Sequence, residues 1–328
     1  MFDSLSLAFV DGKELLVAWT KLDSPPDNAG RRTSRHAPTH LHALLLNSQT
    51  GHEERAGEWP SAYFYATITP IGQKDFLACT EDKIQLLSHD FGVVREQVLS
   101  PPSYCHEIKV SPRKRFFTLR TKGDTSLIDA ESFQPRSKWS AEEALNVHFT
   151  DTVLVGICKP DSGVCTCQRD QHWEPFHPAG VELRMDTSRN EGPFFVNDST
   201  LALAHGRELA VVMLDGTVLL RDSLPKKFSF SRIVTSSEGQ RFAYILTELR
   251  GSAALDMEFL TDDRIVVYDL GQRKAIYTRK LKGGSPWIPP FMEHRNRAAL
   301  SPDGKLLALL DEGILEVYQL PESYPPRE

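Results

Sequence analysis

The sequence lacks the features that mark membrane, exported and disulfide-rich proteins. No apolar run approaches the roughly 18 residues that a membrane-spanning helix needs. The N-terminal residues MFDSLSLAF contain neither the basic segment nor the long apolar core of an export signal. Five cysteines in 328 residues are too few for a disulfide scaffold, and their odd number favours a reducing compartment. We therefore expect a soluble, cytoplasmic protein, or an exported one if a signal precedes Met1.

The chain has no excess of positive charge. Its formal net charge is −6, and charged residues are mixed along the sequence. This balance disfavours a large nucleic-acid surface, so we expect neither nucleic acid nor a membrane as a partner. The one basic run contains Arg31, Arg32 and Arg35, within a loop from Asp23 to Thr39. It is either a solvated loop or a patch that binds an acidic partner.

Common catalytic motifs are also absent. The sequence contains no G-x-S-x-G elbow, no P-loop, no H-E-x-x-H and no G-x-G-x-x-G. We therefore predict no catalytic residue and no cofactor.

The clearest unit in the chain runs from Asn296 to Leu320, NRAALSPDGKLLALLDEGILEVYQL. Its SPDG segment predicts a tight turn, because proline presets φ, aspartate hydrogen-bonds its own backbone and Gly304 accepts a positive φ. Two strands joined by an acidic turn follow it. Three short strands cannot cover both of their faces, so such units must stack.

Diverged copies of this unit fill the chain at intervals of about 40 to 65 residues, a spacing typical of four-stranded propeller blades. Each copy has a first strand, a tight turn, a second strand, a third strand that closes near an acidic or amide residue, and a fourth strand. We refer to these strands as a to d. The predicted blades are approximately 1–60, 61–101, 102–140, 141–180, 190–225, 228–283 and 295–321.

On these residues the chain resembles β-propellers of the WD40 and YVTN type. The segment SPDGKLLAL followed by EVYQL is similar to their recurring blade, and Asp269-Leu270 matches their closing pair, although the Trp-Asp dipeptide is absent. It also resembles uncharacterised bacterial propeller-repeat proteins, for which no activity is implied. The resemblance implies an all-β fold: one β-propeller domain over residues 1–328, with seven blades of four antiparallel strands. The last blade lacks strand d in the sequence pattern.

The long connections are predicted to lie on one rim. The a–b turns are short in every copy, whereas the long connections, 21–40, 177–192, 248–263 and 282–296, join strands b to c or d to a. In a propeller these two classes of connection emerge on the same rim, which we interpret as the binding face. Within it, Trp287, Ile288 and Phe291 are either an exposed partner-binding anchor or a plug over the last blade. Segment 248–263 is predicted to form a short helix or a hairpin.

The candidate metal ligands are Cys158, Cys165, Cys167, His172 and His177, since thiolates and imidazoles bind zinc. If a hairpin places Cys158 opposite Cys165, two or three sulfurs converge. The spacing matches no common zinc pattern, so structural cysteines or a cross-strand disulfide are alternatives.

Two functions are consistent with these patterns. The first is a non-catalytic binding or scaffold propeller that binds a protein or peptide on the long-loop rim. The second is a lactonase-like propeller hydrolase with a site at the mouth of the central channel, because propeller enzymes assemble their sites from several blades.

Overall fold

The computed structural model describes most of the chain. The described residues are 5–22, 39–61, 66–72, 74–80, 83–99, 105, 107–111, 113–120, 124–140, 144–150, 153–158, 164–168, 174–176, 193–205, 207–224, 228–236, 238–252, 257–281, 297–311 and 313–322. Their regular elements are all strands. Within these ranges there is no helix with the length and apolarity to cross a bilayer.

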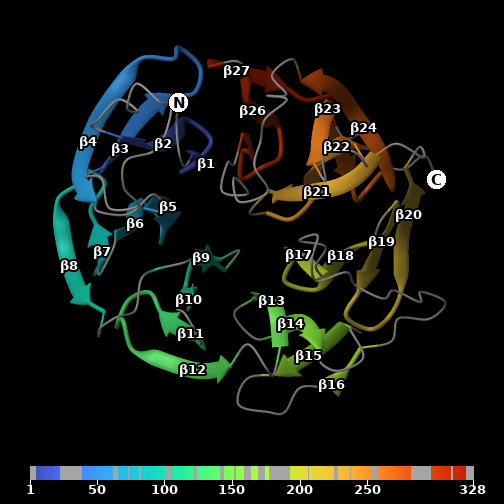
Figure 1. The fold of residues 1–328 in the computed structure, drawn as a ribbon, viewed down its shortest axis with the longest axis horizontal. Coiled ribbons are helices and arrows are strands. Elements are labelled where there is room, and N and C mark those ends of the chain that lie inside the picture. The colour runs from blue at the N-terminus through green and yellow to red at the C-terminus, as the bar shows by residue number, and fades with distance from the viewer. Residues whose placement is uncertain are drawn as a thin grey trace. The chain divides into compact units, whose positions relative to one another are not determined.

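The strands form antiparallel sheets in which neighbours in sequence pair with each other (Figure 1). Six sheets have four strands, and the sheet β25-β26-β27 has three. The predicted all-β fold is therefore confirmed. The prediction of seven four-stranded blades is met only in part: six sheets in the described part of the chain are complete, and the last lacks strand d, as its sequence pattern indicated. The last sheet stops after β27, where the chain continues into Pro321 and Glu322, which are exposed and form no strand.

The chain divides into two compact units, residues 1–138 with 290–299 and residues 139–289 with 300–328. The first unit holds three sheets, with the end of β12 crossing the boundary. Their strands are β1 (Leu5–Phe9), β2 (Glu14–Leu22), β3 (Thr39–Asn47), β4 (Glu53–Ser61), β5 (Thr67–Ile71), β6 (Asp75–Thr80), β7 (Lys83–Leu87), β8 (Val93–Val98), β9 (Glu107–Val110), β10 (Phe116–Arg120), β11 (Asp124–Asp129) and β12 (Pro135–Ser140).

The second unit holds the remaining sheets, with β25 crossing the boundary. Their strands are β13 (Ala144–Phe149), β14 (Val153–Cys158), β15 (Val164–Gln168), β16 (Glu174–Pro175), β17 (Pro193–Asn197), β18 (Thr200–His205), β19 (Glu208–Met213), β20 (Val218–Ser223), β21 (Phe228–Thr235), β22 (Arg241–Ser252), β23 (Met257–Asp269), β24 (Lys274–Leu281), β25 (Ala298–Leu300), β26 (Leu306–Asp311) and β27 (Ile314–Gln319).

The hydrophobic cores lie between consecutive sheets. In the first unit, Leu16 and Leu45 of the first sheet pack with Ile68 and Phe76 of the second, all buried. In the second unit, Leu209 and Val211 of the fifth sheet pack with residues of β22 and β23, including Phe242. Strand β5 lies between β1 and β9, and β17 lies between β13 and β21. Within each unit these a-strands therefore neighbour the a-strand of the next sheet, as expected when faces of short sheets cover one another.

One turn occurs three times between strands a and b. It starts at Ser111, Ser236 and Ser301, whose amides donate to the carbonyl five residues later at 2.9–3.0 Å. The serine Oγ in turn accepts from the amide of that fifth residue, at 3.2, 3.2 and 2.8 Å. The fourth residue of each turn has a positive φ. Two of these residues are glycines, Gly239 and Gly304, and the other is Lys114. The predicted SPDG turn is thus confirmed. The seven predicted a–b turns fall where strand a of a sheet gives way to strand b, and two of them, at Ile71 and Asn197, begin in the last residue of strand a.

Candidate functional site

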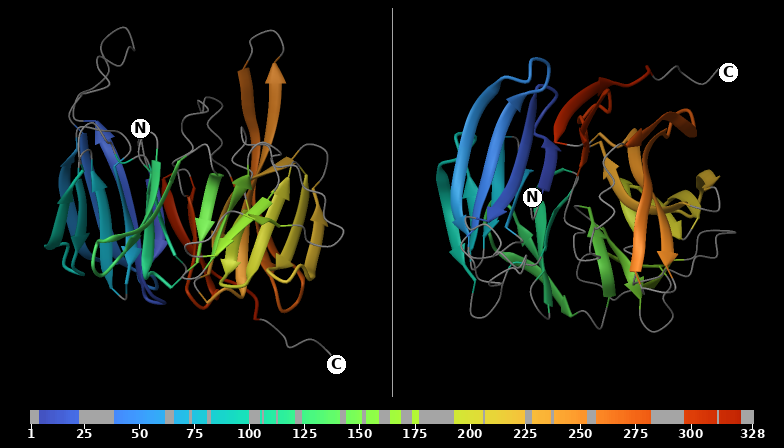
Figure 2. Two further views of the ribbon diagram at one scale, coloured as in Figure 1. Left: turned by 90° about the horizontal axis from the view of Figure 1, so that it is seen from below. Right: turned by 45° about the horizontal axis from the view of Figure 1, so that its top comes forward.

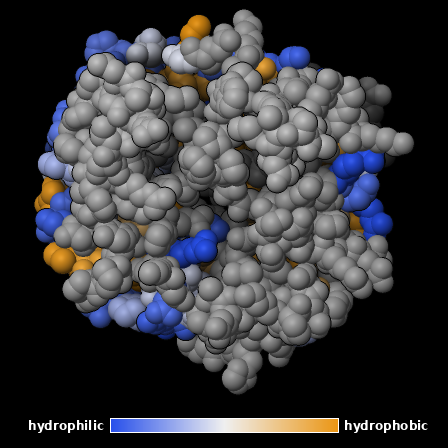
Figure 3. All heavy atoms as spheres, in the orientation of Figure 1, coloured by the Kyte–Doolittle hydropathy of each residue, from blue (hydrophilic) through white to orange (hydrophobic). Residues whose placement is uncertain are grey.

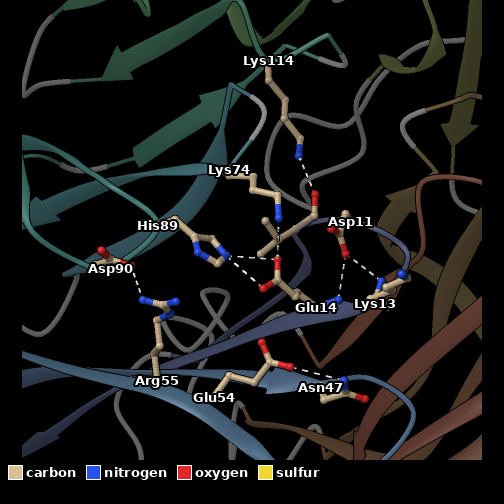
Figure 4. Close-up of polar contacts among 11 residues, drawn as sticks. Asp11, Lys13, Glu14, Asn47, Glu54, Arg55, Lys74, His89, Asp90 and Lys114 are labelled. Carbon is tan, nitrogen blue, oxygen red and sulfur yellow. Dashed lines mark hydrogen bonds and ion pairs between the residues drawn. The ribbon is translucent and has the colours of Figure 1, made fainter.

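A group of charged residues gathers on the a–b turn side of the first unit (Figure 4). We call Asp11, Glu14, Lys74, His89 and Lys114 the Glu14 cluster. Glu14 begins β2 and is buried, with its side chain 10% exposed. Its Oε1 and Oε2 lie 2.9 and 3.1 Å from His89 Nε2, in the β7–β8 turn. Lys74 Nζ lies 3.9 Å from Glu14 Oε2. A carboxylate of the first sheet is therefore bonded to two basic side chains of the second.

The sequence positions these side chains through local turn chemistry. Asp11 Oδ1 accepts from the amides of Lys13, at 2.7 Å, and Glu14, at 2.9 Å, which fixes the turn before β2. The ring of His89 lies nearly parallel to that of Phe76, with centroids 6.4 Å apart. The aromatic contact orients the imidazole toward Glu14. A second contact between the same sheets joins Arg55 to Asp90.

Lys114 brings the third sheet into this group. Its Nζ donates to the Val10 carbonyl at 3.1 Å, and its backbone carbonyl accepts from the Gly72 amide at 3.3 Å. Lys114 therefore contacts the a–b turns of both other sheets in its unit. Burial lowers the pKa of the Lys114 ammonium from its ordinary value, while the negative charge of Asp11 opposes this shift.

The second unit has a different charged contact at the corresponding position. Arg241 begins β22, and its side chain is 4% exposed. Its Nε donates to Asp269 Oδ2 at 2.9 Å within the same sheet. Its two remaining nitrogens donate to backbone carbonyls that flank strands of the next sheet, those of Gly304, in the β25–β26 turn, at 2.9 Å and of Pro321, after β27, at 2.6 Å. We call this arrangement the Arg241 clamp. The Glu14 cluster and the Arg241 clamp both join neighbouring sheets, and their polar atoms contact other groups of the protein.

Strands β22 and β23 continue beyond the rest of their sheet as a two-stranded arm, Leu249–Ser252 with Met257–Asp262. Their pairing reaches Ser252 opposite Met257, whereas β21 pairs with β22 only as far as Glu248, and β24 pairs with β23 only as far as Asp263. Figure 2 shows this arm, in orange, projecting past the other strands of its unit. The prediction of a helix or hairpin in segment 248–263 is resolved as a hairpin.

Apolar exposure in the described part of the chain is concentrated on β8. Val93, Val94 and Val98 are 54–61% exposed, and Ile314 of β27 is the other large apolar side chain with comparable exposure in the described ranges. Orange patches lie at the left edge of Figure 3, on the side where Figure 1 places β8. These valines are dispersed among Arg95, Glu96 and Gln97, so they do not form a continuous apolar surface.

The predicted partner-binding residues lie outside the described ranges. This applies to Trp287, Ile288 and Phe291 and to Arg31, Arg32 and Arg35.

The predicted cysteine group is only partly described, because His172 and His177 also lie outside these ranges. The expected pairing of Cys158 with Cys165 is wrong: Gly156 lies opposite Cys165, and Cys158 lies opposite Ala144. The pair next to the β14–β15 connection is Ile157 with Val164, one residue earlier on each strand than the expected pair. Cys167 is buried. Across the described residues, no group of three or more His, Cys, Asp or Glu is arranged to hold a metal ion.

Sequence reasoning did not identify the Glu14 cluster, the Arg241 clamp or a contact between Cys79 and Cys105. One signal for the first two was available, since Glu14 and Arg241 are charged residues at the start of otherwise apolar b-strands. Apart from Asp269, which lies in the same sheet as Arg241, their partners lie in other blades and carry no local signal.

Comparisons of the whole fold identify its class. The chain is similar to the C-terminal WD40 domain of Sif2, with a TM-score of 0.54 and 10% identity over 98% of this chain and 97% of that one. It is similar to Kluyveromyces lactis Hsv2, with a TM-score of 0.54 and 10% identity over 98% of both chains. A form of that protein with loop 6CD replaced by a Gly-Ser linker gives a TM-score of 0.55 and 11% identity over 98% and 97%. No protein-family model and no curated protein matches the sequence.

The fold is therefore that of a WD40-like β-propeller, as the sequence resemblance implied. At identities of 10–11% the likeness defines the fold and not the activity. The resemblance to bacterial propeller-repeat proteins stays a prediction, since the Hsv2 structures come from Kluyveromyces lactis.

Proposed function

We propose that this chain is a single, non-catalytic β-propeller domain that binds a protein or peptide on the rim of its b–c and d–a connections. Support for a single domain comes from the coverage of 98% of this chain and 97% of the Sif2 WD40 domain in their superposition. The observation that carries the binding proposal is the arm of β22 and β23, which is a b–c connection.

The physical argument concerns the edges of the arm. In the described residues, Leu249–Ser252 pair with Met257–Leu260, and neither run pairs with β21 or β24. A two-stranded hairpin is marginally stable in water on its own. Its outer edges carry backbone donors and acceptors that an extended peptide can pair with. A binding partner that adds a strand or covers the arm would stabilise it.

The opposite side of the sheets favours the same conclusion. The a–b turns are short, and the charged groups there bond to neighbouring sheets through Glu14, Lys114 and Arg241. Side chains engaged in this way hold the blades together. Binding of a partner is then expected at the long connections, because surface loops tolerate insertions and commonly carry binding residues.

The test removes the arm without disturbing the sheet. Glu248 and Asp262 lie opposite each other, so Leu249–Thr261 can be replaced by Asn-Gly, which suits a two-residue hairpin turn. Partners are recovered from a lysate of the source cells and quantified by mass spectrometry. We expect at least one partner to fall by roughly tenfold or more, which corresponds to about 1.4 kcal/mol.

Two further variants test the predicted anchor and basic run, Trp287→Ala with Phe291→Ala, and Arg31, Arg32 and Arg35 each changed to Ser. A matched control in the same unit changes two exposed residues of an a–b turn, Glu238→Ala and Gln240→Ala. The control should recover every partner at the level of the unchanged protein. Equal recovery with all of the rim variants, in proteins of unchanged melting temperature, overturns the proposal.

A further inference from the structure

Two cysteines that are separated by 26 residues meet in the first unit. Cys79 is in β6, the b-strand of the second sheet, and Cys105 precedes β9, the a-strand of the third. Their Cα atoms are 6.2 Å apart, and their sulfur atoms are joined. This Cα distance is within the range that disulfides span. The pair therefore links two neighbouring blades.

The surroundings of the pair are apolar. Cys79 is 1% exposed and Cys105 is 4% exposed. Both belong to the core between the second and third sheets, together with Ile71, Leu77 and Phe117. Reagents in solution therefore reach these sulfurs only when the core between the two sheets opens. A thiolate is the reactive form of cysteine, and an apolar core disfavours it.

The position of the pair differs from that of the other cysteines. Cys167 is buried in the second unit. Cys105 lies in the connection from β8 to β9, a d–a connection, and Cys79 lies near the end of its b-strand. Both positions are on the side of their sheets from which the b–c and d–a connections emerge.

We propose that Cys79 and Cys105 form a disulfide site that closes by exchange with a small-molecule disulfide such as glutathione disulfide, and that the bond ties the second sheet to the third. In the first step the Cys105 thiolate attacks one sulfur of glutathione disulfide, which forms a mixed disulfide and releases one glutathione thiolate. In the second step the Cys79 thiolate attacks the Cys105 sulfur and releases the second glutathione. The protein loses two electrons and two protons, and glutathione disulfide gains them.

Peptide mapping tests the bond directly. Trypsin releases Cys79 in peptide 75–83 and Cys105 in peptide 96–109, while Cys158, Cys165 and Cys167 remain together in 139–169, because Lys159 precedes a proline. The full-length protein is equilibrated in glutathione buffers, free thiols are alkylated after unfolding, and the digest is analysed without reduction. We expect peptides 75–83 and 96–109 to be linked, two hydrogens lighter than their sum. Unlinked peptides with both cysteines alkylated or glutathionylated would overturn the proposal.

Stability gives a second readout. Closing a loop of this length is expected to raise the melting temperature of the oxidised protein by about 5–10 °C over the reduced one. The double variant Cys79→Ala with Cys105→Ala should melt at the same temperature in both buffers. The matched control Cys167→Ala should keep both the linked peptides and the shift. If the double variant does not fold, Cys105→Ser alone should abolish the link and the shift, and a shift that persists in it contradicts the proposed bond.

Access gives a third readout. Reductant should open the bond at least about tenfold more slowly in the native protein than in denaturant, because both sulfurs are buried. Equal rates would place the pair on the surface and contradict the proposed site.

Discussion

Glu14 and Arg241 occupy the same position in two sheets, and their chemistry is reversed. Each begins a b-strand, and each is buried. Glu14 lies opposite Asn47, the last residue of β3, whereas Arg241 lies opposite Asp269, the last residue of β23. Arg241 therefore finds its counter-ion in its own sheet and donates its remaining hydrogens to carbonyls of the next one. Glu14 faces an amide residue in its own sheet, and its basic partners His89 and Lys74 come from the next one.

In these two sheets the position makes a buried polar contact to the following sheet, and the contact is made with either sign of charge. Asn47 and Asp269 retain a shared role in both sheets. Asn47 Oδ1 accepts from the amides of Gln49 and Thr50, at 3.0 and 3.1 Å, and Asp269 Oδ1 accepts from Gln272 at 2.9 Å. The acidic or amide residue that closes strand c thus fixes the next turn. In the sixth blade it also neutralises a buried cation, Arg241.

The largest effect is expected at the Arg241 clamp. Arg241→Ala leaves the Asp269 carboxylate buried without its arginine and removes two donors to the last sheet. We expect a loss of about 3–5 kcal/mol in the free energy of unfolding, measured in urea. Arg279→Ala is the matched control, because Arg279 pairs with Glu316 at a more exposed position, 2.8 Å apart, and should cost about 1 kcal/mol or less. Similar losses in the two variants would contradict the assigned role of the clamp.

A second prediction concerns the glycine that packs on this arginine. Gly304 has a φ of +68°, and an added Cβ would lie 3.1–3.3 Å from carbons of Arg241. Gly304→Ala should therefore cost about 2–3 kcal/mol, from backbone strain together with crowding. Gly313 also has a positive φ, +81°, but has open space around it. Gly313→Ala should cost only about 1 kcal/mol. Equal unfolding free energies for the two variants would show that the contact with Arg241 contributes nothing.

The Glu14 cluster should be less sensitive than the clamp. Glu14→Ala removes the acceptor of His89 and the partner of Lys74, and we expect a loss of about 1–2 kcal/mol by urea unfolding at neutral pH. His89 and Lys74 retain access to solvent, with side chains 23% and 58% exposed, so neither is left buried without hydration. Glu14→Gln keeps an acceptor for His89 and should cost less than Glu14→Ala. A loss at Glu14 as large as that at Arg241 would remove the contrast between the two contacts.

The smallest effect is expected at Asp129, which closes β11 as Asp269 closes β23. Burial raises the pKa of the Asp129 carboxyl, but hydrogen bonds from Ser132 and Arg136 outweigh this, and the pKa lies below its ordinary value. The ionised form therefore stabilises the folded state above about pH 4, and this contribution is lost as the pH falls through the folded-state pKa. Asp129→Asn should cost less than about 1 kcal/mol at pH 7. The difference in unfolding free energy between Asp129→Asn and the unchanged protein should narrow toward pH 2 in acid unfolding experiments. A constant difference would contradict the assigned role of the carboxylate.

The sequence was sufficient for the strands and turns because those depend on nearby residues. Ser301, Pro302, Asp303 and Gly304 define a turn by themselves, and the structure has it. Contacts between blades were not predictable in this way. Glu14 and His89 are 75 residues apart, and nothing in either segment indicates the other. The register of Cys158 was misassigned because Pro160, Asp161 and Gly163 indicate a turn after β14 but do not fix which residues pair across it.

Lys114 has a consequence for the order in which the first unit assembles. Its ammonium reaches the Val10 carbonyl across 104 residues of chain, and its own backbone has the positive φ that glycine occupies in the related turns. Closing a loop of this length costs conformational entropy, so the contact forms only after the three sheets have docked. Side-chain changes at Lys114 should then accelerate unfolding while leaving the refolding rate nearly constant. In this way the lysine stabilises the first unit after its sheets have assembled and takes no part in the folding nucleus.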